Sequence, residues 1–445
     1  MEHFIIDSQT FKDLDIFSEK GGSKSLFDLF KNTQTIAARE RLKAIMQNPS
    51  NNLEEITRRS DSIKFFYDNG ISLEIKNEEV DFIEFYLQSN FRKFKNNPLD
   101  TVADYLTRQS SNDYYVIQTS IKYLIKLAKY VVNFIQSHKS NHLPKQLSLI
   151  FEQIRDIVQT GVLVNVMQMS EVRISFLEVT RLDRALRGNE RENMKVFLHL
   201  VYELDVFQNI AEVAFANGFC FPILNDKADL KISINGLFHP LMVNPVKNDL
   251  YIDNEKNIIF LTGSNMAGKS TLLKSLGLII YLSHLGFPVP ADSMETSVLN
   301  GLVTTINLSD NINQALSHFY SEVKRVKEVS ETLLQRDKIF VIFDELFRGT
   351  NVKDAFDGSS LIISELAAIK NSVFIISTHI IELASVLSKF NNISFLYLDV
   401  YFQNNKPIFT YLIKEGVSKE VLGMYIIRNE GIVEILQLAV KNNRL

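Results

Sequence analysis

The chain has 445 residues, 46% of them hydrophobic and 22% charged, and carries a formal net charge of −4 at pH 7. This composition is typical of a soluble globular protein, and the length suggests two or three domains. The mildly acidic balance excludes a generally basic protein, so any contact with DNA must come from a local basic surface. The single cysteine, Cys220, suits a reducing compartment, and no apolar run approaches the roughly 20 residues that span a bilayer. We therefore expect a cytoplasmic protein that does not enter a membrane.

Three regions that differ in their pattern of apolar and turn-forming residues follow one another along the chain, at residues 1–110, 111–225 and 226–445. The first mixes short apolar runs with turns such as Gly21-Gly22 and Asn48-Pro49, which predicts a small, mainly helical domain. Together the three regions predict a multi-domain protein of α plus α/β class, in which helical domains precede an α/β domain.

The second region has apolar side chains at spacings of three and four, which is typical of one face of a helix. Polar segments at 138–144 and 187–193 interrupt this pattern, and Asn217-Gly218 is suited to end the last helix. We expect long antiparallel helices here, arranged as a lever.

The third region contains short apolar runs at 258–261, 339–343 and 373–377. Strands that are buried on both faces have this appearance, and they favour a mostly parallel sheet flanked by helices. Each run ends in polar residues, which places candidate chemistry at the carboxyl ends of the strands.

The first of these strands leads into a glycine-rich loop. Residues 263–270 fit the phosphate-binding pattern G-x-x-x-x-G-K-[ST], and a helix is expected to follow at 271–285. The glycines let backbone N–H groups close around phosphate oxygens, and the helix N-terminus adds a positive dipole end. Lys269 is expected to reach the β- and γ-phosphates of ATP, and Ser270 to ligate Mg²⁺. The alternative is a glycine turn with no ligand. The predicted nucleotide-binding residues are Gly263, Ser264, Asn265, Met266, Ala267, Gly268, Lys269, Ser270 and Thr271.

The other two strands end in residues suited to ATP hydrolysis. After the strand at 339–343, Asp344 is expected to hold Mg²⁺ and Glu345 to orient or deprotonate the attacking water. After the strand at 373–377, His379 is a candidate catalytic residue that senses the γ-phosphate. Each motif alone could be a strand end or a structural histidine, but their order along one chain predicts an ATPase.

These motifs resemble the ATPase domain of the MutS family, which belongs to the ABC superclass of ATPases. The matching segments are His239-Pro240, Asn265-Met266, 286–291, 317–322, 344–350, Ser377-Thr378-His379 and Glu382-Leu383. A weaker likeness to the MutS core domain and lever covers the upstream part of the chain.

The resemblance implies a helical core domain, a lever and an ABC-type ATPase domain that uses ATP and Mg²⁺. It also implies a homodimer with ATP at the interface, where Ser317 acts on the γ-phosphate of the partner subunit. The segments 419–428 and 431–441 resemble the helices through which the family dimerises. The chain departs from the family pattern at Ser264 and Ala267, where the family has proline and glycine. We further expect no counterpart of the mismatch-reading domain, and a clamp domain that is reduced or absent.

A DNA contact is expected through double-stranded backbone phosphates. Lys122, Lys126 and Lys129 share one helical face, with Lys139 and Lys145 nearby; the alternative is a solvated helix face. The predicted function is a nucleotide-gated dimeric clamp on DNA, related to mismatch repair. The alternative is a nucleotide-gated interaction ATPase that acts on a non-DNA partner, such as the ribosome or a repair protein. A transporter ATPase subunit is disfavoured, since the segment Leu-Ser-Gly-Gly-Gln is missing.

Overall fold

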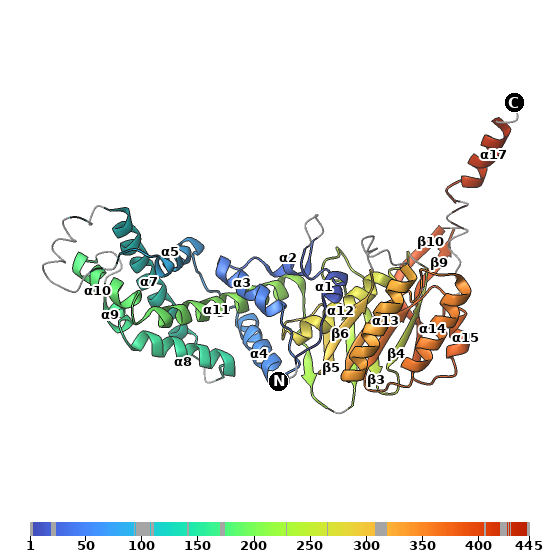
Figure 1. Ribbon diagram of the computed structural model, residues 1–445, viewed down its shortest axis with the longest axis horizontal. Coiled ribbons are helices and arrows are strands. Elements are labelled where there is room, and N and C mark those ends of the chain that lie inside the picture. Colours follow the sequence, from blue (N-terminus) through green and yellow to red (C-terminus); the bar gives the residue numbers. More distant parts are fainter. Residues whose placement is uncertain are drawn as a thin grey trace. The chain divides into compact units, whose positions relative to one another are not determined.

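The computed structural model describes most of the chain, and its elements are drawn in Figure 1. The described residues are 3–18, 24–92, 94, 107, 111–139, 142–169, 174–227, 229–264, 266–307, 318–404, 406–418, 425, 427 and 429–442. The chain divides into two compact units. The sheet unit comprises Met1–Leu26, Pro49–Ile56 and Asn217–Leu445, and the helical unit comprises Phe27–Asn48 and Thr57–Ala216. The first 110 residues, expected to form one domain, thus contribute to both units.

The helical unit confirms the amphipathic helices that the sequence predicts. Its two longest helices, α7 and α11, have 26 and 27 residues. The helices of this part of the chain are α2 (Leu26–Phe30), α3 (Ile36–Met46), α4 (Leu53–Asn69), α5 (Asn77–Gln88), α7 (Asn112–Ser137), α8 (Lys145–Gln159), α9 (Leu163–Gln168), α10 (Phe176–Leu186) and α11 (Arg191–Asn217). Ser111 caps α7, and Ser175 with Glu178 forms a capping box on α10, which satisfies N–H groups that a helix start leaves unpaired.

Buried polar groups connect the helices of this unit. On α11, the carboxylate of Asp205 accepts hydrogen bonds from the backbone of Gln34 and from the backbone and hydroxyl of Thr35, at the start of α3. On α10, Asp183 pairs with Arg187 at 2.6 Å, and both side chains are almost fully buried. The contacts of Asp205 join α11 to the start of α3, because a slipped helix would leave this buried carboxylate without its hydrogen-bond donors.

The sheet unit contains the α/β architecture that the sequence predicts. A six-stranded sheet has the order β10-β9-β4-β8-β7-β6, in which β10 alone runs antiparallel to its neighbour. Its strands are β4 (Ile258–Thr262), β6 (Gly301–Thr305), β7 (Ile339–Asp344), β8 (Val373–Ser377), β9 (Ile393–Gln403) and β10 (Lys406–Glu415). A four-stranded sheet of order β1-β5-β2-β3 is built from β1 (Ile223–Asn225), β2 (Lys231–Leu237), β3 (Asn248–Asp253) and β5 (Ser293–Ser297).

Helices cover the larger sheet. Val329 of α13 (His318–Gln335) and Ile363 of α14 (Val352–Leu366) belong to one buried cluster with Phe260 and Val341 of the strands. On α12 (Lys269–His284), Gly277 lets Leu14 approach; an added Cβ would lie 2.5 Å from the Leu14 side chain and 3.4 Å from that of Ile342. The other helices in the described part of this unit are α1 (Ser8–Asp13), α15 (Leu383–Leu387) and α17 (Ile432–Asn442).

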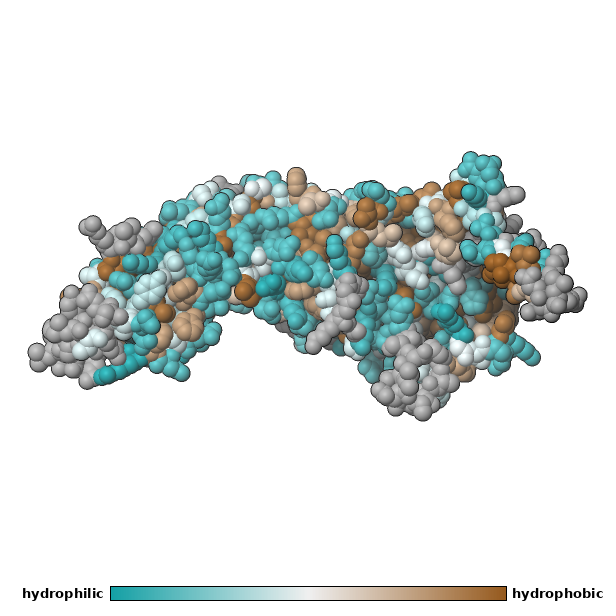
Figure 2. Space-filling model, turned by 90° about the horizontal axis from the view of Figure 1, so that it is seen from above, coloured by the Kyte–Doolittle hydropathy of each residue, from teal (hydrophilic) through white to brown (hydrophobic). Residues whose placement is uncertain are grey.

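Helix α17 exposes apolar side chains. Ile435, Leu436 and Leu438 are 62%, 60% and 59% exposed. In Figure 2, brown apolar atoms lie exposed where this C-terminal helix is seen from above. The upstream segment expected to assist in dimerisation, 419–428, lies mostly outside the described residues. Among the described residues, no helix combines the length and apolar character needed to cross a membrane.

Candidate active site

The loop between β4 and α12 has the backbone geometry of a phosphate cradle. Gly263 and Gly268 have φ values of 144° and 94°, which favour glycine, and Gly268 is the N-cap of α12. A Cβ at Gly268 would lie 3.2 Å from the ring of Tyr411, so both the turn and the packing require glycine. The hydroxyl of Ser264 is buried and has no hydrogen-bond partner in the described part of the chain. A phosphate oxygen would satisfy it, which supports a nucleotide in this loop.

Lys269 lies inside this loop and is only 3% exposed. Its Nζ donates a hydrogen bond to the carbonyl oxygen of Gly263 at 2.7 Å. Burial lowers the pKa of Lys269, while the negative charges of Glu345 and Asp344 oppose this shift. The charge of the lysine is thus enclosed between the loop and the two carboxylates.

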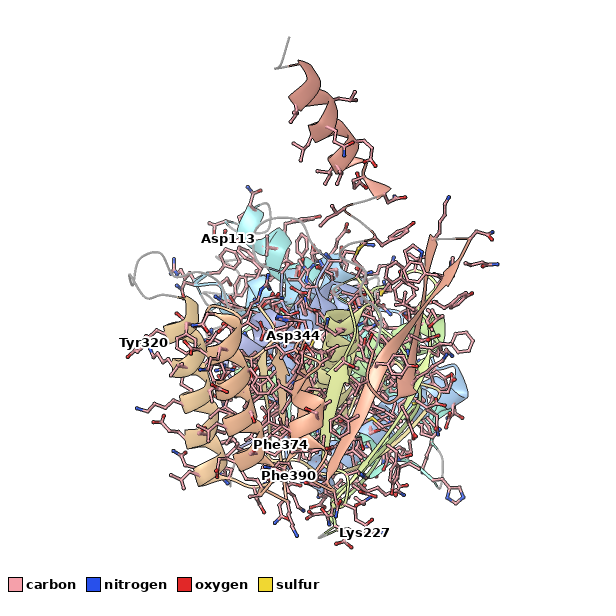
Figure 3. The ribbon with its side chains drawn as sticks, turned by 90° about the vertical axis from the view of Figure 1, so that its right-hand side faces the viewer. Asp113, Lys227, Tyr320, Asp344, Phe374 and Phe390 are labelled. Carbon is pink, nitrogen blue, oxygen red and sulfur yellow. The ribbon has the colours of Figure 1, made fainter. Side chains whose placement is uncertain are left out.

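Asp344 joins the loop to the ends of two neighbouring strands. The hydroxyl of Ser270 donates to Asp344 Oδ2 at 2.7 Å, and the hydroxyl of Ser377 donates to Asp344 Oδ1. These contacts arise because β7 and β8 are parallel neighbours, with Asp344 opposite Ser377 in the register. In Figure 3, Asp344 lies at the opposite end of the sheet from Lys227. A hydroxyl and a carboxylate oxygen are ligands suited to Mg²⁺, which commonly takes few protein ligands and fills its shell with water and phosphate.

Glu345 and His379, the two predicted catalytic residues, lie close together. Nδ1 of His379 is 3.9 Å from Oε2 of Glu345, and Nε of Arg348 is 3.7 Å from the same oxygen. Glu345 has a φ of 56°, a conformation that is uncommon for a residue with a side chain, and its N–H donates to the Ser377 carbonyl oxygen at 3.0 Å. The backbone bond to β8 thus holds the turn that directs this carboxylate toward the site.

A pocket of about 410 Å³ opens beside these carboxylates. Its walls are the end of β6, the turn after β7 and the first turns of α13, represented by Thr305, Asn307, Glu322, Glu345 and Gly349. Two predicted site residues, Asn265 and Ser317, lie outside the described residues.

A second pocket, of about 560 Å³, adjoins the loop at Met266 and Gly268, and the sequence does not predict it. Phe238, His239, Met266, Thr271 and Tyr411 are among the residues that line it. His239-Pro240 is one of the segments that resemble the MutS ATPase domain, but no local pattern in the sequence indicates Tyr411. Its place depends on an irregularity in β10 between Phe409 and Ile413.

Asn248 of β3 holds that irregularity in place. Its side-chain amide donates to the carbonyl oxygen of Tyr411 at 3.0 Å, and its side-chain oxygen accepts from the N–H of Ile413 at 2.8 Å. Tyr411 itself has a φ of 58°. The smaller sheet therefore fixes one wall of the second pocket.

The lysines proposed for DNA contact are partly engaged within the helical unit. Lys126 pairs with Glu79, and Lys129 donates to the carbonyl oxygen of Met169. Lys122 is half-buried, whereas Lys139 and Lys145 are exposed. The expected stripe is therefore not a row of unpaired cations.

Comparison with known proteins places the chain in a family. A family model of MutS domain III matches residues 9–333, and one of MutS domain V matches residues 259–444. The chain is 31% identical over 242 residues to the DNA mismatch repair protein MutS of Anaplasma phagocytophilum (strain HZ), which covers 54% of this chain and 29% of that protein. It is 30% identical over 279 residues to the DNA mismatch repair protein MutS of Petrotoga mobilis (strain DSM 10674 / SJ95), covering 60% and 33%. The match thus spans at most about a third of these relatives' length. The chain belongs to the MutS family.

Proposed function

We propose that this protein is a Mg²⁺-dependent ATPase. The observation that carries the proposal is the hydrogen bond of 2.7 Å between Ser270 and Asp344, which joins the phosphate cradle to the acidic strand end beside Glu345. Three groups of different chemistry thus meet at one edge of the sheet: a buried cation, a magnesium-type ligand pair and a carboxylate placed for water. Family membership supports the same reading.

The proposed reaction is the attack of water on the γ-phosphate, which releases ADP and phosphate. Lys269 binds the β- and γ-phosphates through its ammonium group, and the N–H groups of the loop bind the remaining oxygens. Ser270 and Asp344 would hold Mg²⁺, which neutralises developing negative charge when bound. Glu345 orients the water and accepts its proton, while His379 contacts the γ-phosphate region and orients Glu345.

The second pocket is the proposed seat of the adenosine group. It adjoins the loop at Met266 and Gly268, and its aromatic side chains Phe238 and Tyr411 offer faces on which a purine can stack. Its volume of about 560 Å³ falls in the usual range for ligand sites.

The proposed assembly is a homodimer. Helix α17 exposes Ile435, Leu436 and Leu438, and an apolar helix in water is stabilised when a second copy covers it. In the family's arrangement, Ser317 would then act on ATP held by the partner subunit. Light scattering should show a dimer of Glu345→Gln with ATP. A monomer at all concentrations would refute this assembly.

The proposed partner is double-stranded DNA, which the protein binds through the backbone phosphates with an affinity that depends on the bound nucleotide. The proposed location is the cytoplasm. The internal bonds of Lys126 and Lys129 favour the second candidate, an ATPase that acts on a non-DNA partner such as the ribosome or a repair protein. The two functions differ in salt dependence, because phosphate contacts release counterions and weaken steeply as salt rises.

The ATPase assignment is tested with Glu345→Gln. This change removes the proton acceptor but keeps the size of the side chain, so ATP binding should persist while turnover falls by roughly 10²–10⁴. The control is Glu331→Gln, which removes a carboxylate from an exposed pair with Lys327 on α13. Equal turnover of wild type and Glu345→Gln would contradict the role of Glu345.

The partner is tested by titrating duplex DNA at two salt concentrations, with and without ATP. A steep salt dependence that changes with ATP supports the DNA clamp. The same duplex with one G·T mispair tests whether mismatches are preferred; a tenfold preference corresponds to about 1.4 kcal/mol. Absence of binding at low salt would favour the non-DNA partner.

A further inference from the structure

The N-terminal segment, residues 3–18, is part of the sheet unit although the strands follow it by more than 200 residues. Ile5 forms a parallel bridge with Gly301 at the outer edge of β6. The N–H of Ile5 donates to Asn300, and the N–H of Leu302 donates to Ile5, both at 2.8 Å. A Cβ at Gly301 would lie 2.8 Å from Ile5, so this close approach requires glycine. The segment therefore covers an edge that would otherwise offer unpaired backbone groups.

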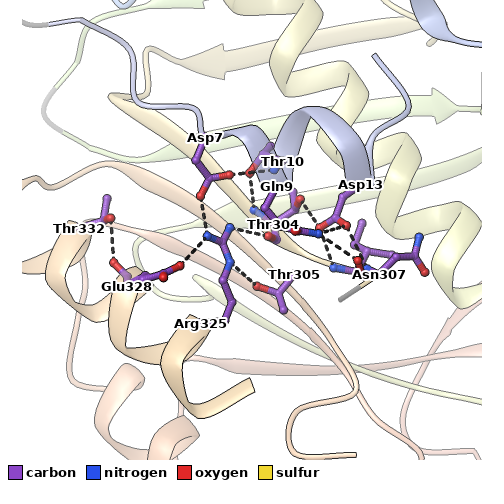
Figure 4. A network of polar contacts seen from close by, with 11 residues as sticks. Asp7, Gln9, Thr10, Asp13, Thr304, Thr305, Asn307, Arg325, Glu328 and Thr332 are labelled. Carbon is purple, nitrogen blue, oxygen red and sulfur yellow. Dashed lines mark hydrogen bonds and ion pairs between the residues drawn. The ribbon is translucent and has the colours of Figure 1, made fainter. Parts of the chain in front are cut away.

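Asp13, at the end of α1, binds the carboxyl end of β6. It is 1% exposed, and its Oδ2 accepts from the hydroxyl of Thr304 and the N–H of Ile306, both at 2.8 Å. Its Oδ1 accepts from the N–H of Asn307 at 3.0 Å and from the amide of Gln9 at 2.8 Å. Four donors thus converge on one carboxylate, as Figure 4 shows. In Asp13→Asn, an amide nitrogen would replace one of these oxygens. Because this nitrogen is itself a donor, it could not accept the hydrogen bonds that the oxygen accepts.

Asp7, at the N-cap of α1, fixes the other end of the same short helix. Its Oδ2 accepts from Arg325 of α13 at 2.6 Å, and Arg325 also donates to the Thr304 carbonyl oxygen at 2.7 Å and to the Thr305 hydroxyl at 3.2 Å (Figure 4). The side chain of Arg325 is 7% exposed. One arginine therefore ties α13 both to β6 and to the N-terminal segment.

The residues held in this way are walls of the pocket beside the catalytic carboxylates. Thr305, the last residue of β6, lines it with the following Ile306 and Asn307, and Val326, next to Arg325, lines it from α13. Glu345 lines the same pocket. A shift of the β6 end would change the space in which water approaches Glu345, whereas none of Thr305, Ile306 and Asn307 lines the aromatic pocket.

We propose that Asp13 is a positioning residue for ATP hydrolysis, which holds the backbone of Ile306 and Asn307 and so sets the shape of the pocket in which Glu345 acts. This inference rests on the proposed ATPase function. It makes the N-terminal segment a part of the hydrolytic apparatus in addition to its role as the cover of a strand edge. A purely structural anchor would instead affect stability and leave turnover of the folded protein unchanged.

The test is Asp13→Asn, with the ATP dissociation constant, kcat and thermal unfolding measured on the full chain. We expect kcat to fall roughly ten- to hundredfold, as small displacements at a reacting centre do, while the dissociation constant stays within about twofold. Thr304→Val removes one of the four donors and should lower kcat by a smaller factor, roughly two- to tenfold. Glu331→Gln, an exposed carboxylate on α13, is the matched control and should turn over like wild type.

The outcomes separate the two proposals. Hydrolysis by wild type together with unchanged kcat in folded Asp13→Asn would overturn the positioning role alone. Equal loss of ATP binding and of kcat would overturn it too, because the effect would then be general loosening. Wild type that binds ATP without hydrolysing it would overturn the ATPase function and the positioning role with it. Should Asp13→Asn fail to fold, unchanged kcat in Thr304→Val would be decisive against the role.

Discussion

The two units of this protein use buried charge in opposite ways. In the helical unit, the buried charges of Asp183 and Arg187 pair with each other. Arg187 also donates to the carbonyl oxygen of Phe91, and Tyr86 donates to Asp183. In the sheet unit, the buried Lys269 belongs to a loop that lines one pocket through Met266 and Gly268, while Asp344 and Glu345 line another pocket.

The difference shows how stability and function can be assigned to separate residues. A buried pair that satisfies its own hydrogen bonds gives structural specificity, and the loss of one member leaves the other buried without a partner. Charges that surround a pocket contribute mainly to the free energy of ligand binding, because the ligand supplies their partner. Removal of a charge from the helical unit should therefore cost stability, and removal of Lys269 should cost ligand affinity.

The largest effect is expected from a substitution that breaks the buried pair of Asp183 and Arg187. Arg187→Ala leaves the carboxylate of Asp183, which is 0% exposed, without its cation. The free energy of unfolding should fall by about 3–5 kcal/mol. Urea unfolding followed by circular dichroism measures this loss, and ATP affinity of the remaining folded protein should not change. Lys195→Ala, which removes an exposed cation from α11, is the control and should have little effect. A similar small effect of Arg187→Ala would contradict the comparison.

The next largest effect is expected at His284, in the dependence of the sheet unit's stability on acid pH. Burial lowers the pKa of His284 to about 4, and its Nε2 accepts a hydrogen bond from Leu299 in the neutral form. The unfolded state therefore binds more protons than the folded state between pH 6.5 and about 4, so stability falls as pH decreases through this window. The contribution of this one group amounts to about 3 kcal/mol.

The measurement for His284 is the urea midpoint of wild type and His284→Gln at several pH values from 7 to 4. The glutamine oxygen can still accept the N–H of Leu299 but does not titrate, so its pH dependence should be shallower. Parallel curves for the two proteins would show that His284 does not carry the effect.

A smaller effect is expected at the phosphate cradle. Lys269→Ala should weaken ATP binding by roughly 10- to 100-fold, the usual value of a hydrogen bond to a charged group. Its stability should change little, in contrast to Arg187→Ala. Isothermal titration with a non-hydrolysable ATP analogue measures the affinity, and Lys256→Ala, an exposed cation of the same unit, should bind like wild type.

The smallest effect is expected at the surface of the helical unit. Lys126→Ala breaks an ion pair in which the lysine side chain is 46% exposed. Exposed pairs contribute at most about 1 kcal/mol, so the urea midpoint should hardly move. A loss of stability as large as that of Arg187→Ala would show that exposure does not separate the two kinds of ion pair.

Replacement of Lys122, Lys126 and Lys129 by glutamate should weaken the binding of all DNA duplexes alike if these residues contact DNA.

The sequence predicts the class of fold well because the periodic patterns are strong. The long helices α7 and α11 follow from apolar spacing, and the strands β4, β7 and β8 follow from short apolar runs. The division into units was less predictable. The segments 1–26 and 49–56 join the sheet unit through contacts such as Asp13 with Thr304, which are 291 residues apart. Local patterns carry no information about such distant partners.

By itself the sequence determined the residues at the strand ends: Lys269 and Ser270 after β4, Asp344 and Glu345 after β7, and His379 after β8. This was possible because parallel neighbouring strands bring their carboxyl ends to one edge, so that order along the chain is enough to predict proximity. Only the tertiary structure decided that Tyr411 faces the loop and that Asp13 holds the end of β6. These placements depend on an irregular strand and on pairing across hundreds of residues, and both result from packing of the whole unit.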